Sequence, residues 1–212
     1  MHIPDGFLNI ATVATTYAVS AGGVGNAVRI ANKKLGEKQV PLMGILAAFI
    51  FAAQMLNFPI AGGTSGHFLG AALAAILLGP WAAVLIMSCV LLAQCLIFQD
   101  GGLLALGANI FNMGIVASFS SYYIYRLVTL LMGDGRRGIL VGGFAGAWVS
   151  VFLASIVCAI ELAVSGASPM GIVLPAMAGV HALIGIGEGL ITGAVLSLVL
   201  ATRADLLQLQ RI

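Results

Sequence analysis

Charged residues are scarce in this chain of 212 residues, where lysine, arginine, aspartate and glutamate together account for only 8%. Because a soluble globular domain carries about 25% charged residues, this scarcity excludes an ordinary water-soluble fold. Hydrophobic residues instead make up 61% of the chain, and the mean hydropathy is +1.12. We therefore expect an integral membrane protein that is embedded in the lipid bilayer.

Other missing features narrow the function. The chain contains no G-x-x-x-x-G-K-S/T phosphate loop and no soluble domain. If the chain drives uptake, the energy therefore has to come from elsewhere. The amino terminus lacks the basic region and cleavage site of a signal peptide, and we expect Met1 to be the mature first residue. The cysteines, Cys89, Cys95 and Cys158, lie in apolar runs without disulfide or zinc spacing, which indicates core residues. We expect no nucleic-acid partner.

Long apolar runs dominate what is present, and about 20 such residues cross the roughly 30 Å hydrocarbon core as a helix. The runs predict helices over residues 9–32, 40–58, 67–79, 80–98, 107–132, 138–164 and 173–202. The third run is too short for a full crossing. We expect it to be short, tilted or re-entrant and to pair with the fourth at Gly79, Pro80 and Trp81. The predicted fold class is all-α, a polytopic bundle of about seven transmembrane helices in one domain, residues 1–212.

The basic residues predict how the helices are oriented. All nine lysine and arginine residues fall within 29–38, 126–137 and 203–211, and cytoplasmic loops carry such an excess. An even number of crossings must separate successive cytoplasmic clusters. The seven predicted helices meet this condition, with four crossings between the first two clusters and two between the last two. This count predicts a multi-pass plasma-membrane protein with its amino terminus outside and its carboxyl terminus in the cytoplasm. It also assigns all three histidines to the outer half of the membrane.

The amino terminus carries an arrangement that can chelate a metal. The free amine of Met1, the amide nitrogen of His2 and the Nδ1 atom of the His2 ring can close a five-membered and a six-membered ring around one ion. Three nitrogens in one plane suit Ni(II) or Cu(II), whereas zinc prefers a tetrahedron. His67, at the outer end of the short third helix, is the best candidate for a fourth nitrogen. We expect affinity to fall between about pH 8 and 5.5, because protons must leave the amine and the imidazoles.

Further polar residues are expected to support these ligands. They are Asp5, Thr64, Ser65, Gln99, Asp100 and His181. Asp5 would bring a negative charge near the metal, and Gln99 or Asp100 could orient a ligating imidazole. His181 and Glu188 share one helix face. They either support the metal site or make hydrogen bonds across the bundle, which is the interpretation that we favour.

Two other functions remain compatible with the composition. A channel or secondary carrier that works alone predicts metal flux without an ATPase, although the sequence shows no acidic rings. An intramembrane metalloenzyme would use His67, His181 and Glu188, but the H-E-x-x-H spacing of many zinc enzymes is absent. Substitution separates them, because His181→Ala would abolish the enzyme whereas His2→Ala would abolish a transporter site at the amino terminus.

Four motifs, in order along the chain, resemble a known family. MHIPDGFL, NFPIAGGTSGHFLGAALAAILLGPW, FQDGGLLALGANIFNMG and HALIGIGEGLIT are similar to the substrate-binding (S) component of energy-coupling-factor (ECF) nickel and cobalt transporters, the CbiM/NikM family. The resemblance extends from Met1 to about Thr202. It implies a core of six helices preceded by one extra amino-terminal helix, and a metal held by the amino terminus, His2 and His67.

The resemblance also implies a substrate and partners. The opening MHIPDG is similar to nickel-linked members, whereas cobalt-linked members begin MHIMEG, so Ni²⁺ is the expected transported substrate and Co²⁺ the second. The chain itself would not be an enzyme. Two cytoplasmic ATPases would hydrolyse ATP, and a transmembrane coupling subunit would connect them to this component. A small accessory membrane protein accompanies many systems of this kind.

Overall fold

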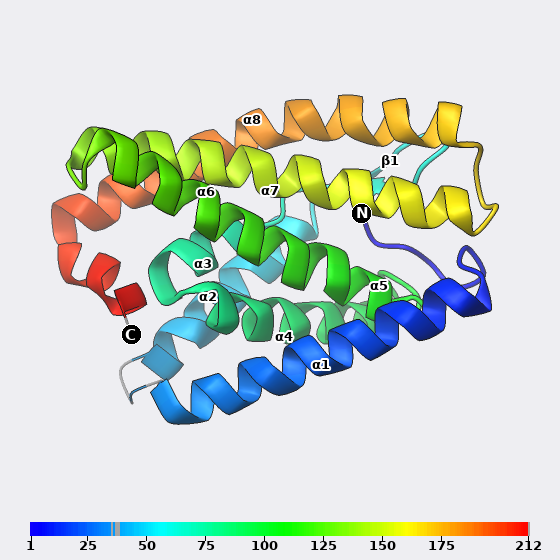
Figure 1. Cartoon of the computed structure of the whole chain (residues 1–212), viewed down its shortest axis with the longest axis horizontal. Coiled ribbons are helices and arrows are strands. Elements are labelled where there is room, and N and C mark those ends of the chain that lie inside the picture. The colour runs from blue at the N-terminus through cyan, green and yellow to red at the C-terminus, as the bar shows by residue number, and fades with distance from the viewer. Residues whose placement is uncertain (35, 37–38, 212) are drawn as a thin grey trace.

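Helices form most of the structure, a computed structural model that describes residues 1–34, 36 and 39–211 (Figure 1). In chain order the elements are α1 (Ile10–Lys34), α2 (Gln39–Gln54), β1 (Phe58–Pro59), β2 (Ser65–Gly66), α3 (Ala71–Leu78), α4 (Pro80–Phe98), α5 (Leu106–Asn109), the π-helix η1 (Ile110–Val116), α6 (Ala117–Met132), α7 (Arg136–Val164), α8 (Met170–Thr202) and the 3₁₀-helix η2 (Ala204–Arg211). The expected all-α bundle is confirmed. Lys38, part of the first basic cluster, lies outside the described residues.

Most predicted helix boundaries agree with the structure to within a few residues. Elements α5, η1 and α6 follow one another without a break, in agreement with the predicted run over 107–132. The second predicted helix is wrong at its end, because α2 stops at Gln54 and the apolar residues that follow form a loop. The third is wrong at its start, because residues 67–70 are not helical. Hydropathy alone does not distinguish an apolar loop from a helix, and proline and glycine interrupt this one.

Helix α3 is short, as its sequence predicts, and the structure shows that it is also buried. All eight of its residues are buried, and a helix of that length spans about 12 Å. Gly70 precedes it with φ = 77°, and a Cβ atom there would lie 2.6 Å from Cγ1 of Ile50, so this turn requires glycine. Gly79 ends α3, and α4 begins at Pro80, which confirms the expected pairing with the next helix.

Among the described residues, four helical segments are long and apolar enough to cross a membrane, namely α4, the continuous segment from α5 to α6, α7 and α8. Helix α1 has 25 residues, but its mean hydropathy is lower than that of these four segments. The apolar helix α2 is shorter than they are, with 16 residues. The non-helical residues before α3 include His67 and Leu69, both of which are buried. Irregular backbone at membrane depth is tolerated where protein surrounds it.

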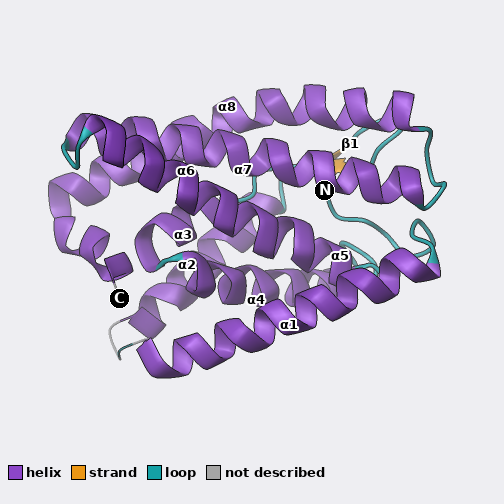
Figure 2. Ribbon diagram, in the orientation of Figure 1, coloured by secondary structure: helices purple, strands orange, loops and turns teal. Residues whose placement is uncertain are grey.

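The connections between the helices collect at two ends of the bundle (Figure 1). Segments 1–9, 99–105 and 165–169 lie toward the right of the figure, whereas the end of α1, the turn between α6 and α7, and η2 lie toward the left. The described basic residues belong to or adjoin the left-hand segments. Figure 2 shows the short strand β1 beside the amino terminus, and β2, which pairs with β1, contacts Met1 directly.

Candidate metal centre

The first three residues are buried inside the bundle. Met1 and Ile3 are 0% exposed and His2 is 4% exposed. Burying a chain terminus is costly unless its polar groups find partners. The Ile3 amide donates to Oδ1 of Asn109 at 2.8 Å, and Nδ2 of Asn109 donates to the Ile3 carbonyl at 3.1 Å. This reciprocal pair from α5 fixes the backbone immediately after the two candidate ligands.

Asp5 holds the next part of the chain against the loop before α5. Its carboxylate accepts hydrogen bonds from the backbone amides of Leu103, Leu104 and Ala105 at 3.1, 2.7 and 3.3 Å. The Gly102 amide donates to the Ile3 carbonyl at 2.8 Å. Asp5 is exposed, and these bonds anchor it to the loop before α5.

Ser65 in β2 brings the terminal nitrogens together. The Met1 amine donates to Oγ of Ser65 at 2.8 Å and also to the Ser65 carbonyl, and the His2 amide donates to the same Oγ at 3.1 Å. The imidazole of His67, two residues further along, stacks on that of His2 with ring centroids 4.5 Å apart and planes inclined by 22°. The amine and the amide therefore share one acceptor, and the two stacked rings belong to the residues on either side of it.

Each of the two rings has one nitrogen engaged and one unpaired. Nε2 of His2 lies 3.0 Å from Oε1 of Gln94, and Nδ1 of His67 lies 2.7 Å from the Phe68 carbonyl. Within the described part of the chain, Nδ1 of His2 and Nε2 of His67 are buried without a hydrogen-bond partner. A buried polar atom without a partner requires an explanation. A metal ligand whose other ring nitrogen is held by an oxygen has this pattern.

Burial keeps the candidate ligands neutral. Loss of solvent lowers the pKa of the Met1 amine from 8.0 to about 5, and the charge of Asp100 only partly opposes it. Loss of solvent, followed by the nearby amine, lowers the pKa of His2 to about 3. The expected loss of affinity between pH 8 and 5.5 through these two groups is therefore wrong in its range, because both have already lost their protons in the folded chain at pH 7.

Asp100 lies beside His2. Its Oδ1 atom is 3.3 Å from Nδ1 of His2. Because the imidazole is neutral, this contact is not an ion pair. Oδ2 of Asp100 accepts a hydrogen bond from Asn57 at 2.9 Å. Burial raises the pKa of the Asp100 carboxyl. Among the residues expected to orient an imidazole, Asp100 is thus next to His2, whereas Gln99 is exposed and ends α4 with φ = 55°.

The remaining predicted residues contact other parts of the bundle. Oγ1 of Thr64 is 3.9 Å from Sγ of Cys158 and 4.0 Å from Sδ of Met177. His181 is fully buried, and its Nδ1 atom lies 2.7 Å from the Met177 carbonyl. Glu188 accepts hydrogen bonds from the backbone at the start of α3. Glu188 therefore makes the favoured hydrogen bonds across the bundle. The contact of His181 is to a carbonyl of its own helix α8, and within the described part of the chain its Nε2 atom is buried without a hydrogen-bond partner.

Sequence reasoning missed three residues that hold the site: Gln54, Gln94 and Asn109. All are buried, and Gln94 interrupts the apolar run of α4. A polar side chain within a membrane segment is costly and usually functional, so this interruption was the available signal. What the sequence could not supply was the partner, because Gln94 and His2 are 92 residues apart along the chain.

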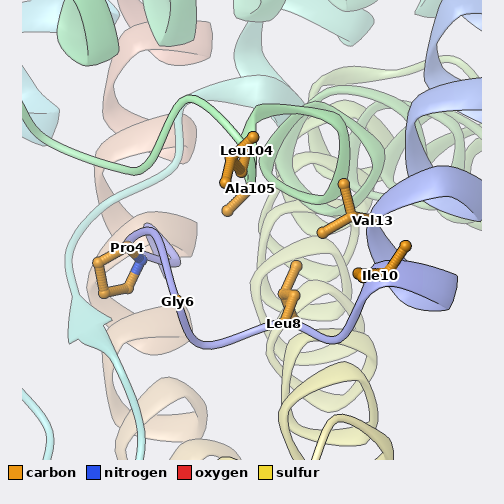
Figure 3. Close-up of a pocket in the computed structure, with 7 residues that line it drawn as sticks. All are labelled: Pro4, Gly6, Leu8, Ile10, Val13, Leu104 and Ala105. Carbon is orange, nitrogen blue, oxygen red and sulfur yellow. The ribbon is translucent and has the colours of Figure 1, made fainter.

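A cavity close to the amino-terminal segment is apolar. Figure 3 shows Leu8, Ile10 and Val13 on one side of it and Leu104 and Ala105 on the other. Its volume is about 280 Å³. Its lining has no ionisable side chain, so this cavity is unsuited to a metal ion.

Side chains alone do not make a metal site here. Among the described residues, no three histidine, cysteine, aspartate or glutamate side chains gather closely enough to hold an ion. Any site at this place has to include backbone nitrogen. The cluster around Ser65 supplies two such nitrogens, the terminal amine and the His2 amide, beside two imidazoles.

Known proteins are similar over nearly the whole chain. A family model described as "Cobalt uptake substrate-specific transmembrane region", CbiM, matches residues 2–206. A protein of Archaeoglobus fulgidus, whose name proposes a fused nickel transport protein NikMN, is 45% identical over 210 residues, which cover 98% of this chain and 68% of that protein. The cobalt transport protein CbiM 1 of Pelobacter propionicus is 36% identical over 209 residues, covering 94% of this chain and 91% of that protein.

Solved structures agree with these sequence matches. The crystal structure of a truncated transition metal transporter superimposes with a TM-score of 0.89 at 38% identity, covering 95% of this chain and 99% of that one. The similarity therefore includes the amino-terminal helix, the short α3 and the long helices that follow. Together with the matching family model, it shows that the chain belongs to the CbiM family, whose model describes the substrate-specific transmembrane region of cobalt uptake.

Proposed function

We propose that this chain binds Ni²⁺, with Co²⁺ as the second candidate, and that it is the substrate-specificity subunit of an ATP-driven ECF transporter. The observation that carries this proposal is the buried, neutral Met1 amine beside two stacked imidazoles, each with one unpaired nitrogen. The family is one of uptake components, so the chain is a transport component and not an enzyme. Relatives named for nickel and for cobalt transport support both ions as substrates.

The proposed ligands are four nitrogens: the Met1 amine, the His2 amide, Nδ1 of His2 and Nε2 of His67. The first three close two chelate rings, and a planar set of four nitrogens favours Ni²⁺. The His2 amide must lose its proton to bind, because a protonated amide nitrogen has no free electron pair. Oγ of Ser65 lies on the side where the amine and the amide both point, so we expect this hydroxyl to move when the ion enters.

We further propose that residues 1–212 form a single membrane domain with the amino terminus outside and the carboxyl terminus in the cytoplasm. The concentration of basic residues at one end of the bundle supports this orientation. The chain carries no phosphate loop. A transmembrane coupling subunit and cytoplasmic ATPases would therefore supply the driving force, with a small accessory membrane subunit in addition.

The experiment that tests the ligand set adds one methionine ahead of Met1. The added residue retains every side chain but moves the free amine out of the chelate. We expect the wild-type protein to bind about one Ni²⁺ with the visible absorption of a planar nitrogen complex, and the extended protein to lose both. His181→Ala is the matched control, because it changes a buried histidine outside the proposed ligand set and should keep the metal and its spectrum.

An unchanged nickel content and spectrum in the extended protein would contradict the chelate. In that case His67 with His181 becomes the alternative site. Reconstituted vesicles address the stand-alone channel or carrier, because metal flux without any ATPase would exclude a pure specificity subunit.

A further inference from the structure

A line of hydrogen bonds connects His2 to the backbone beside α3. Nε2 of His2 lies 3.0 Å from Oε1 of Gln94, and Nε2 of Gln94 donates to Oε1 of Gln54 at 3.0 Å. Nε2 of Gln54 then donates to the carbonyl of Leu69 at 2.7 Å. Both glutamines are 0% exposed. The line joins the amino terminus, α4, α2 and the chain before α3.

The direction of every bond in this line follows from its last member. A backbone carbonyl can only accept a hydrogen bond, so Gln54 must turn its NH₂ group toward Leu69 and its oxygen toward Gln94. Gln94 must then donate to Gln54 and present its own oxygen to His2. The ring nitrogen facing that oxygen has to carry the proton. Nε2 of His2 is thereby the protonated nitrogen, and Nδ1 keeps its lone pair.

The Leu69 carbonyl is itself held in place from α8. Glu188 accepts hydrogen bonds from the Leu69 amide at 2.9 Å and the Gly70 amide at 2.5 Å. Glu188 therefore fixes the peptide groups on both sides of Leu69, and the carbonyl that accepts from Gln54 belongs to the second of them. Inside a bundle without competing solvent, such a network is strongly directional. The orientation of Gln54 consequently depends on the fold and is independent of His2.

Asp100 favours the opposite arrangement of the His2 ring. Its Oδ1 atom lies 3.3 Å from Nδ1 of His2, and a carboxylate at that position would attract a proton on Nδ1. A proton there would block the nitrogen that closes the chelate. The neutral ring carries a single proton, so Gln94 and Asp100 compete for it. The line of glutamines decides the competition in favour of Nε2.

We propose that Gln54 and Gln94 are positioning residues that hold the His2 proton on Nε2 and keep Nδ1 free for the metal. The role of the free nitrogen as a ligand rests on the proposed function, but the position of the proton does not. Among the described residues, Gln54 is connected to His2 by hydrogen bonds through Gln94. A residue one contact away from the ring therefore sets which nitrogen can bind.

The test reads the proton directly in metal-free protein. ¹⁵N-histidine NMR distinguishes a protonated from an unprotonated ring nitrogen, and His2→Ala identifies the resonances of His2. We expect wild type to show a protonated Nε2 and a bare Nδ1. In Gln54→Met, Gln94 can rotate its amide and donate to Nε2, so we expect a substantial population with the proton on Nδ1 facing Asp100.

Gln54→Glu is the conservative rescue. A carboxyl oxygen at this position accepts from Gln94 whether or not the group is protonated, so the wild-type proton position should persist. Ser88→Ala removes another buried polar group of α4, whose hydroxyl donates to the Val84 carbonyl in the same helix, and serves as the control for packing. An unchanged proton position in Gln54→Met would overturn the proposal. A shift of the proton to Nδ1 in Ser88→Ala as large as that in Gln54→Met would also overturn it.

Nickel titration separates this inference from the proposed function. We expect Gln54→Met to bind Ni²⁺ about 10 to 100-fold more weakly, as is typical when a residue supporting a ligand is removed, and Gln54→Glu to stay close to wild type. If the proton moves to Nδ1 in Gln54→Met but wild type binds no nickel, the role of the glutamines is supported and the metal site is refuted. If the proton stays on Nε2 in Gln54→Met and wild type binds nickel tightly, the metal site is supported and the role of the glutamines is refuted.

Discussion

At the scale of single residues, the terminal amine of Met1 is the most unusual group in the molecule. A chain terminus is ordinarily solvated and protonated at neutral pH, whereas this one is fully buried and donates to Ser65. Burial disfavours the charged form of an amine and lowers its pKa. The result is a neutral nitrogen donor, already free of its proton, at the place where His2 and His67 stack.

This pKa predicts how the stability of the metal-free protein depends on pH. The amine has a pKa of about 5 when folded and 8.0 when solvated, so the unfolded chain binds the extra proton between these values. Acidification across this window therefore favours unfolding, by at most about 4 kcal/mol. We expect the Tm of metal-free protein in detergent to fall between pH 8 and 5.

The chain extended by one methionine is the control for this pH dependence. Its amine lies outside the buried position, so its Tm should fall less than that of wild type over the same range. Because His2 and Asp100 are present in both proteins, the difference between the two curves isolates the amine. Parallel curves would mean that the terminal amine is solvated in the folded protein.

At the scale of elements, the loop from 99 to 105 and the first residues of the chain form one unit. Gly102 donates to the Ile3 carbonyl, and Asp5 accepts from the three amides that follow. A Cβ atom on Gly102 would lie 2.1 Å from Oδ1 and 2.3 Å from the backbone nitrogen of Asp5. There is consequently no space for any other residue unless the amino-terminal segment moves.

Gly102→Ala should therefore weaken nickel binding without changing a ligand. We expect a loss of affinity of about 10 to 100-fold, the range for residues that support a metal ligand, because the terminus can no longer reach its position. Isothermal titration with Ni²⁺ measures it. Gly25→Ala is the matched control, since nothing lies within 4 Å of a Cβ there. Equal affinities in the two variants would show that the loop does not position the terminus.

At the scale of the whole molecule, the sequence predicts the number and order of helices well and their contacts poorly. Apolar runs reveal helices because a membrane demands them, and the short α3 is visible in the same way. The hydrogen bonds that join Gln94 with Gln54 and with His2 cannot be predicted from the sequence, because the residues are 40 and 92 positions apart. The chelate proposed at the amino terminus could be derived from the sequence because its geometry is local, whereas the glutamine line depends on how helices pack.

The orientation in the membrane is the remaining prediction for the whole molecule. Because basic residues favour the cytoplasm and gather at one end of the bundle, the other end should face outward. Ala167 and Gly135 are exposed positions in loops at opposite ends. In a background without the exposed Cys89, Ala167→Cys should react with a membrane-impermeant maleimide in intact cells. Gly135→Cys should react only after permeabilisation, and the reverse pattern would place the proposed metal site on the cytoplasmic side.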